Sequence, residues 1–124
     1  MPAVIAYFHT PFSVLQESER RVRLAGTKGS STVCIVLIDM AQGRLSSANL
    51  GDSGFLVLGS TASERHLHVK YRSPQQEHEF GFPFQLGHQD SADRANDAVL
   101  MTLPVRAGGV QTLTGILLHL ICLF

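Results

Sequence analysis

The sequence predicts an α+β domain whose core is an antiparallel β-meander followed by a long loop. A polar stretch with helical spacing comes first, and an apolar run and an alternating run joined by turn residues come next. A segment without any sustained period follows them. The length of 124 residues and a hydrophobic content of 44% provide enough apolar material for one compact domain.

One short amphipathic helix is expected near the N-terminus, over residues 12–22. This segment lacks Gly and Pro, and Phe12, Leu15 and Val22 fall roughly on one helical face. An ordered connector is the alternative for the same residues.

A β-hairpin is expected next. Thr32–Ile38 is an uninterrupted apolar run rich in β-branched residues, which favours a strand covered on both faces. Asp39–Gly43 supplies turn chemistry, and Arg44–Leu50 returns in rough alternation. The two runs therefore predict an antiparallel pair of strands.

The meander is expected to continue beyond this hairpin. Gly51–Gly54 predicts a second turn into a strand at Phe55–Leu58, and Leu67–Tyr71 can form a fourth strand after a polar loop. Ala98–Val105 is a further candidate strand, with Pro104 near its end.

The long loop is expected over residues 74–96, which are rich in Gln, Glu, His, Gly and Pro. Loops of this length in compact domains are usually functional or disordered. Phe80, Phe82, Phe84 and Leu86 alternate within it, which suggests that aromatic side chains anchor the loop to the body.

The charge and the cysteine content of the chain indicate which classes of binding partner and which cellular compartment to expect. Ten Lys and Arg balance ten Asp and Glu, so the chain lacks the basic field that attracts nucleic acid or an anionic membrane. Cys34 and Cys122 lie far apart and do not form the dense framework of a small secreted scaffold. We therefore expect an intracellular protein without nucleic-acid or membrane partners. Residues 1–8 show no targeting segment, and the apolar run 115–124 is too short for a spanning helix.

The tetrapeptide Gly51-Asp52-Ser53-Gly54 raises the question of a nucleophilic serine. A catalytic triad needs a His base beside the serine and an acid behind it. His9 is the only His before Ser53, and Phe55 stands where trypsin-like proteases have a second Gly. A turn between core strands explains the same residues, because Gly gives backbone freedom and Asp or Ser satisfies nearby amides.

Two other motifs invite a functional interpretation. Gly26–Ser31 has the residue types of a phosphate loop, but Lys28 precedes Gly29 and a strand follows, so a lead-in to that strand is the better interpretation. His66 and His68 would face the same side of a strand, as in some metal sites. Surface histidines on an edge strand are the alternative, since no second ligand pair completes a zinc site.

Four segments carry a family signature: Gly29–Cys34, Leu45–Val57, Arg72–Phe80 and Phe82–Leu86. In this order they resemble the middle of a metal-dependent protein phosphatase of the PP2C family. The branch most similar to them is that of the mitochondrial and plastid T-cell-activation-type phosphatases. The similarity runs from about Tyr7 to about Gly108. The family branch implies a mitochondrial or plastid location as one expectation.

The resemblance implies a fold, a cofactor and a substrate. The fold would be part of an α-β-β-α sandwich, with Gly51, Asp52, Ser53 and Gly54 as a strand-to-strand turn and Asp52 as structural support of the site. Two Mg²⁺ or Mn²⁺ ions held by aspartates would activate a water that attacks the phosphorus of a phosphoserine or phosphothreonine in a phosphoprotein. Ser53 would not be a nucleophile.

The chain departs from this family pattern at the metal ligands. The family places them in Asp-Gly, Asp-Gly-Leu-Trp-Asp and Asp-Asn elements, and no Asp of this chain is followed by Gly or Asn. We therefore assign no catalytic or metal-ligating residue, and expect Mg²⁺ or Mn²⁺ to bind poorly. Residues 1–108 are predicted to be a partial phosphatase domain, and residues 109–124 a divergent apolar tail.

Two functions follow for the chain. The first is a PP2C-type protein serine/threonine phosphatase by family, inactive as this chain alone. The second is a non-catalytic fragment or binding module. A serine hydrolase using Ser53 is the remote alternative.

Overall fold

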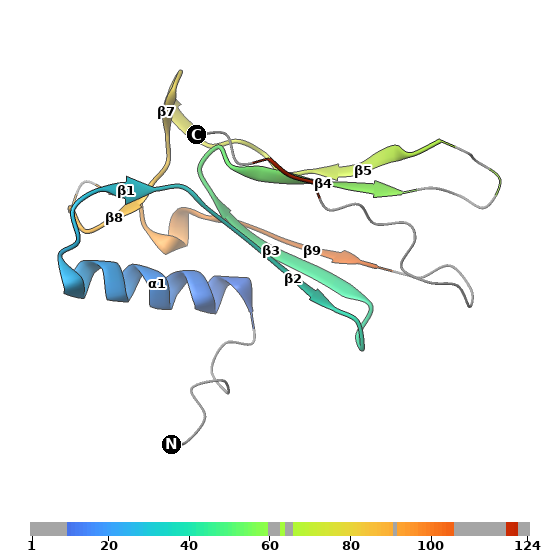
Figure 1. Cartoon of the computed structure of the whole chain (residues 1–124), viewed down its shortest axis with the longest axis horizontal. Helices are drawn as coiled ribbons and strands as arrows, with labels where there is room; N and C mark the ends of the chain where they lie inside the picture. The colour runs from blue at the N-terminus through green and yellow to red at the C-terminus, as the bar shows by residue number, and fades with distance from the viewer. Residues whose placement is uncertain (1–9, 60–62, 64–65, 91, 106–118, 122–124) are drawn as a thin grey trace.

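The computed structural model of the chain describes residues 10–59, 63, 66–90, 92–105 and 119–121 (Figure 1). One long helix and two three-stranded sheets dominate it. Figure 1 shows the helix α1 on one side of the sheet β2-β3-β9 and the strands β4 and β5 on the other. The α+β fold class is therefore confirmed, with three layers in the order helix, sheet, sheet.

The helix α1 spans Pro11–Ala25, so the helix expected over residues 12–22 is confirmed and is longer than expected. Thr10 caps its start, because the Thr10 Oγ1 accepts a hydrogen bond from the Ser13 N–H at 3.1 Å. Gly26 ends it in the left-handed conformation at φ 60°. Leu15 is fully buried and fixes the face that packs on the sheet.

The middle layer is an antiparallel sheet in the order β2-β3-β9. Its strands are β2 (Val33–Asp39), β3 (Arg44–Leu50) and β9 (Val99–Pro104), which confirms the predicted hairpin and the predicted strand near Pro104. The expectation that β2 is covered on both faces is confirmed in part. Val33 and Ile35 pack toward α1. Cys34, Val36 and Ile38 pack toward the second sheet. β2 is an edge strand whose residues are half-buried or exposed, and Leu37 is 43% exposed. β3 is more buried than β2 because it pairs with a strand on each side.

The second sheet has the order β10-β4-β5. Its strands are β4 (Gly54–Gly59), β5 (His68–Arg72) and β10 (His119–Ile121). The predicted strands at 55–58 and 67–71 are confirmed, but the meander is divided between two sheets. β9 occupies the free edge of β3, as the pairing of Ala48 with Leu100 shows, so the turn after Leu50 carries the chain across to the other layer.

Two hydrophobic clusters join the layers. The first lies between α1 and the middle sheet, and its buried members are Leu15, Ala48, Leu50, Leu86 and Ala95. The second lies between the two sheets, and its buried members are Leu45, Phe55 and Val57. The rings of Phe55 and Tyr71 contact each other there, with centroids 5.5 Å apart. Both clusters use β3, whose alternate side chains point to opposite layers.

The predicted long loop has short regular elements in place of a structureless run. They are β6 (Glu77–Glu79), β7 (Phe82–Pro83), β8 (Leu86–Gly87) and the 3₁₀ helix η2 (Ala95–Asp97). Each has only two or three residues, which is too short to create a visible period. β8 pairs with β1 (Ser30–Ser31), and β6 pairs with β7.

The aromatic anchoring of this segment is confirmed in part. Leu86 is 6% exposed, and Phe84 packs against the cluster beneath α1. Phe80 and Phe82 are 98% and 65% exposed, so the expectation that they anchor the segment is wrong. Phe80 and Phe82 lie in the short β6–β7 hairpin, whereas Phe84 and Leu86 follow it.

The expected boundary after residue 108 lies outside the described residues. Within residues 109–124 the structure describes the backbone of β10, which pairs antiparallel with β4. A search of the described residues finds no helix with the length and apolar character needed to cross a membrane.

Candidate functional site

The turn between β3 and β4 is close-packed, and two of its glycines are required for steric reasons. Gly51 has φ +104°, and a Cβ atom there would lie 2.5 Å from both the Phe84 carbonyl oxygen and the Thr32 Cγ2. A Cβ atom at Gly54 would collide with the Ser73 Oγ. No other residue type fits at either position without movement of the neighbours.

A segment from β5 to β6, residues 73–76, holds this turn from outside. The Ser73 Oγ accepts a hydrogen bond from the Phe55 N–H at 2.8 Å, and the Ser73 N–H donates to the Phe55 carbonyl at 3.0 Å. The Gln76 Oε1 accepts from the Gly51 N–H at 3.0 Å, and the Gln76 N–H donates to the Gly51 carbonyl at 3.0 Å. Turn and segment therefore form one hydrogen-bonded unit.

Gln76 is a residue that sequence reasoning missed. Its Nε2 also donates to the Asp97 carbonyl at 2.7 Å, and its carbonyl accepts from the Phe84 N–H at 3.1 Å. One amide side chain thus ties the β3–β4 turn to η2. Its position inside a family-like segment is the only signal in the sequence, because no local period or motif points to it.

Ser53 lies in this unit and is 9% exposed. Its Oγ is 2.6 Å from the Thr32 Oγ1, and either hydroxyl can donate. A threonine hydroxyl is not a general base, so this contact does not activate a nucleophile in the way a histidine would. The geometry gives Ser53 a packing role in the turn, and its chemical role stays a prediction.

Asp52 is half-buried and stands beside Ser53. Its carboxylate makes no hydrogen bond or ion pair with the residues that the structure describes. Asp52 is therefore held in place by the close-packed backbone on both sides of it. Its role as structural support of a site stays a prediction.

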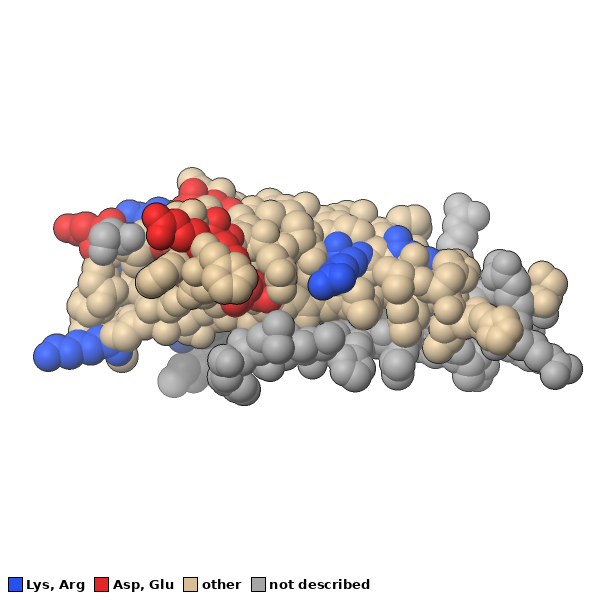
Figure 2. All heavy atoms as spheres, turned by 90° about the horizontal axis from the view of Figure 1, so that it is seen from above, with Lys and Arg blue, Asp and Glu red and all other residues tan. Residues whose placement is uncertain are grey.

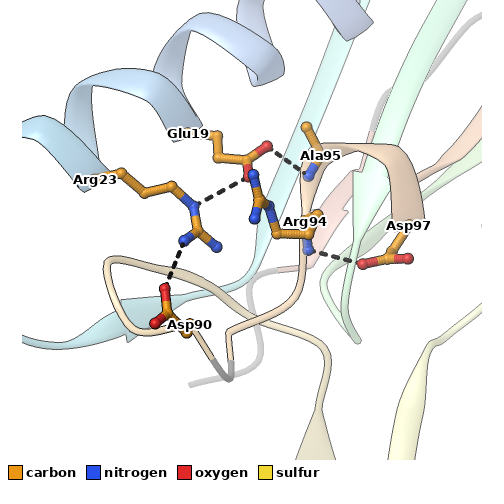
Figure 3. A network of polar contacts seen from close by, with 6 residues as sticks. All are labelled: Glu19, Arg23, Asp90, Arg94, Ala95 and Asp97. Atoms are coloured by element: carbon orange, nitrogen blue, oxygen red, sulfur yellow. Dashed lines mark hydrogen bonds and ion pairs between the residues drawn. The ribbon is translucent and has the colours of Figure 1, made fainter.

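Glu19 forms the most buried carboxylate network of the described residues (Figure 3). Its Oε1 accepts hydrogen bonds from the Arg23 Nε at 3.2 Å and from the Arg94 Nε, and its Oε2 accepts from the Ala95 N–H at 2.9 Å. Burial raises the pKa of Glu19, but the Ala95 amide and the Arg94 guanidinium outweigh that effect and hold the pKa below its ordinary value. This network fixes α1 to η2.

Other carboxylates also serve the fold. The Asp93 Oδ1 pairs with the His78 Nε2 at 2.8 Å, and the Asp93 Oδ2 accepts from the Gln85 N–H at 2.8 Å. The Asp97 Oδ2 accepts from the Arg94 N–H at 2.8 Å. On the surface, hydrogen bonds from Arg20 and Arg21 lower the pKa of Glu17 to about 2.

A metal centre is not assembled by the described residues alone. Among them, no group of three or more His, Cys, Asp or Glu side chains could hold an ion. His66 and His68 are both exposed, and His68 begins the edge strand β5. The described side chains alone therefore do not fit a pair of Mg²⁺ or Mn²⁺ ions, which need several carboxylate oxygens together.

The segment Gly26–Ser31 is a connector, as its order of residues predicts. Gly26 caps the C-terminal end of α1, and Ser30–Ser31 form β1. A strand follows it, so no helix N-terminus is available for a phosphate.

Several known proteins similar to this chain are named protein phosphatases. The chain is 53% identical over 58 residues to the human protein phosphatase PTC7 homolog. These 58 residues cover 47% of this chain and 17% of that protein. The chain is 36% identical over 107 residues to the PTC7 homolog fig of Drosophila grimshawi, covering 79% and 33% of the two chains. It is 35% identical over 100 residues to the probable protein phosphatase 2C 80 of Arabidopsis thaliana, covering 81% and 22%.

A solved structure shares the fold. The X-ray structure of the photosystem II phosphatase PBCP superposes with a TM-score of 0.62 and 28% identity, over 79% of this chain and 35% of that one. No family model matches the chain. The chain spans about a third or less of the length of each of these relatives. Together the relatives and the shared fold confirm the predicted resemblance of this chain to the PP2C family of protein phosphatases, in the branch of the PTC7 homologues.

Proposed function

We propose that this chain is a scaffold segment of a PP2C-type protein serine/threonine phosphatase and that it does not hydrolyse phosphoproteins by itself. Residues 1–108 are the partial phosphatase domain in this proposal, and residues 109–124 are a tail foreign to it. In a complete phosphatase, bound Mg²⁺ or Mn²⁺ would supply an activated water for attack on a phosphoserine or phosphothreonine. This chain would supply the two sheets beneath such a site.

The observation that carries this proposal is the use of the carboxylates. Glu19, Asp93 and Asp97 accept hydrogen bonds that hold α1, η2 and the 74–96 segment together. Glu17 is paired with two arginines, and the Asp39 Oδ1 accepts from the Gln42 N–H. A divalent ion needs several carboxylate oxygens that are free to converge, and these carboxylates already have other partners.

Asp52 has a different position in the proposal. Its carboxylate has no partner among the described residues, and Gly51 and Gly54 fix the backbone around it by close contact. We assign it the supporting role that the family resemblance implies, at the end of the scaffold where the chain passes between the sheets. Ser53, with its hydroxyl against Thr32, supports the turn and takes no part in the chemistry.

Two proteins test the proposal together. One is the purified 124-residue chain, and the other is the PTC7 homolog of Drosophila grimshawi in which residues 10–105 of this chain replace the matching segment. We expect no hydrolysis of a phosphoserine peptide by the chain in the presence of Mn²⁺. The chimaera is expected to hydrolyse it, with loss of activity on addition of a chelator. Turnover by the purified chain that rises with Mn²⁺ and disappears with chelator would refute the proposal.

The same chimaera separates Asp52 from Ser53. Asp52→Ala is expected to lower phosphatase activity, whereas Ser53→Ala should retain it and cost only about 1 kcal/mol of stability from the lost contact with Thr32. Covalent labelling of Ser53 by a serine-hydrolase probe would favour the hydrolase alternative instead.

A further inference from the structure

The β6–β7 hairpin presents two aromatic side chains to solvent. Phe80 is 98% exposed and Phe82 is 65% exposed. Figure 1 shows the hairpin standing away from the layered body. Single exposed apolar residues are normal on protein surfaces, but adjacent exposed aromatic residues are typical of interaction sites.

The base of the hairpin is held rigidly. The His78 Nε2 is 2.8 Å from the Asp93 Oδ1, and the His78 ring stacks on the Phe84 ring with centroids 4.1 Å apart. The Phe84 N–H donates to the Gln76 carbonyl at 3.1 Å. The exposed tip is therefore supported by contacts to the body, so the tip itself loses little conformational entropy when a partner binds.

Two acidic side chains lie in the same hairpin as the aromatic ones. Glu79 pairs directly across the hairpin with Phe82, and Glu77 pairs with Pro83. Residues opposite one another in an antiparallel pair have side chains on the same face, so Glu79 and Phe82 project from the same face of the hairpin, next to a register shift between Glu77 and Glu79. Both glutamates are exposed. We call the four residues Glu77, Glu79, Phe80 and Phe82 the Glu–Phe tip.

The charge of the tip indicates what it binds. Neither glutamate forms an ion pair within the described part of the chain, and residues 77–83 contain no Lys or Arg. In the space-filling view from above, acidic atoms gather toward one end of the molecule (Figure 2). A guanidinium or ammonium group is attracted both by a carboxylate and by the face of an aromatic ring.

We propose that the Glu–Phe tip docks a basic segment of another protein, in which an Arg or Lys lies against Phe80 or Phe82 and pairs with Glu79. Apolar side chains beside that Arg or Lys would cover the remaining surface of the two rings. The site needs no metal and no catalytic residue, so it stands whether or not the chain belongs to an active phosphatase.

Three probe peptides test the charge and the apolar requirement. They repeat the units Ala-Arg-Leu, Ala-Glu-Leu and Ala-Arg-Ser. The full chain is fused at Met1 to a soluble carrier protein, and fluorescence anisotropy measures how tightly each peptide binds to it. We expect the Ala-Arg-Leu peptide to bind most tightly and added salt to weaken it. The Ala-Glu-Leu peptide should not bind. The carrier protein alone is the blank.

Variants of the tip locate the binding. Replacing both aromatic residues, Phe80→Ala with Phe82→Ala, should weaken binding of the Ala-Arg-Leu peptide by about tenfold or more. Glu77→Gln with Glu79→Gln should weaken it and also reduce its dependence on salt. Met40→Ala and Asp90→Asn are matched controls, because they remove an exposed apolar and an exposed acidic side chain outside the tip. They should bind like the parent chain.

Other results would overturn the proposal. Equal binding of the acidic and basic peptides would remove the charge argument. Unchanged binding by the double Phe variant, with a proteolysis pattern like that of the parent chain, would place the site elsewhere. Self-association of the chain that the double Phe variant abolishes would assign the tip to a second copy, and absence of binding by every peptide would show that the tip docks no basic segment.

Discussion

The two sheets of the sandwich differ in how much cover they receive. The sheet β2-β3-β9 has α1 on one face and the second sheet on the other. The sheet β10-β4-β5 packs against the middle sheet through Phe55 and Val57, whereas Leu56 and Leu58 on its other face are only half-buried. Burial therefore follows the layer and not the hydrophobicity of the strand: β3, with Ser47 and Asn49, is more buried than β4.

The largest expected effect comes from removing a side chain between the layers. Leu45 is fully buried between the sheets, so Leu45→Ala should lower the free energy of unfolding by about 2–5 kcal/mol. Leu58→Ala removes the same atoms from the open face and should cost about 1 kcal/mol or less. Pulse proteolysis in urea measures both. Similar losses in the two variants would mean that the faces are equally covered.

The next largest loss of stability is expected in the turn that carries the chain from β3 in one sheet to β4 in the other. Gly51→Ala and Gly81→Ala both place a side chain at positive φ, which costs about 1–3 kcal/mol of backbone strain. A Cβ atom meets nothing within 4 Å at Gly81, but it meets Thr32 and the Phe84 carbonyl at Gly51. Gly51→Ala should therefore lose about 1–3 kcal/mol more than Gly81→Ala, by urea unfolding. Equal losses would show that the turn has room to relax.

A substitution at Glu19 tests how strongly α1 is held over the middle sheet. Glu19→Gln keeps the shape of the side chain but weakens its contacts with Arg23, Arg94 and Ala95, and should cost about 1–3 kcal/mol of unfolding free energy. Glu17→Gln alters an exposed surface pair on the same helix and is the matched control, with a much smaller expected loss.

The same pair of variants predicts a dependence on pH. The folded pKa of Glu19 lies below the ordinary value of 4.5, so its ionised form stabilises the fold above about pH 4.5. This contribution should be lost as the pH falls through the folded pKa. The difference in unfolding free energy between the parent chain and Glu19→Gln should therefore shrink as the pH falls below 4.5. A difference that is constant down to pH 2 would contradict the assignment.

The smallest effect on stability is expected on the open face. Leu56→Thr together with Leu58→Thr should change the free energy of unfolding by about 1 kcal/mol or less. It should reduce both the binding of an environment-sensitive dye and the sedimentation of aggregates, because exposed apolar strands promote association. Leu24→Thr, at a 75% exposed position on α1, is the control for a general gain in polarity.

The local part of this fold was predictable from sequence, and the layer positions were not. The apolar run of β2 and the alternation of β3 specify a hairpin through neighbouring residues. Which strand lies at the centre of the sheet depends on β9, which enters the sheet some fifty positions later, where Asn49 pairs with Val99. The run of Val and Ile in β2 therefore indicated a strand that packs on both faces, but it did not indicate that this strand lies at the edge of its sheet.

The same distinction holds for the candidate site. Gly51–Gly54 was recognisable as a turn because Gly and Asp mark turns locally. The contacts of Gln76 with Gly51 and Asp97, and of Glu19 with Arg94, join residues far apart in the sequence. Nothing in the neighbourhood of Gln76 or Glu19 distinguishes them from ordinary surface residues, so neither was predicted.

The pairing of β3 with β9 also has a consequence for the order of assembly. During synthesis the β2–β3 hairpin is complete while the residues that cover its second edge are still to be added, because Arg44 pairs with Pro104 and Asn49 with Val99. At about 5–20 residues per second, the ribosome needs on the order of several seconds to make that stretch. Throughout this interval the backbone donors and acceptors on the β9 side of β3 have no strand partner. Pairing across so long a separation in sequence favours slow closure of the middle sheet.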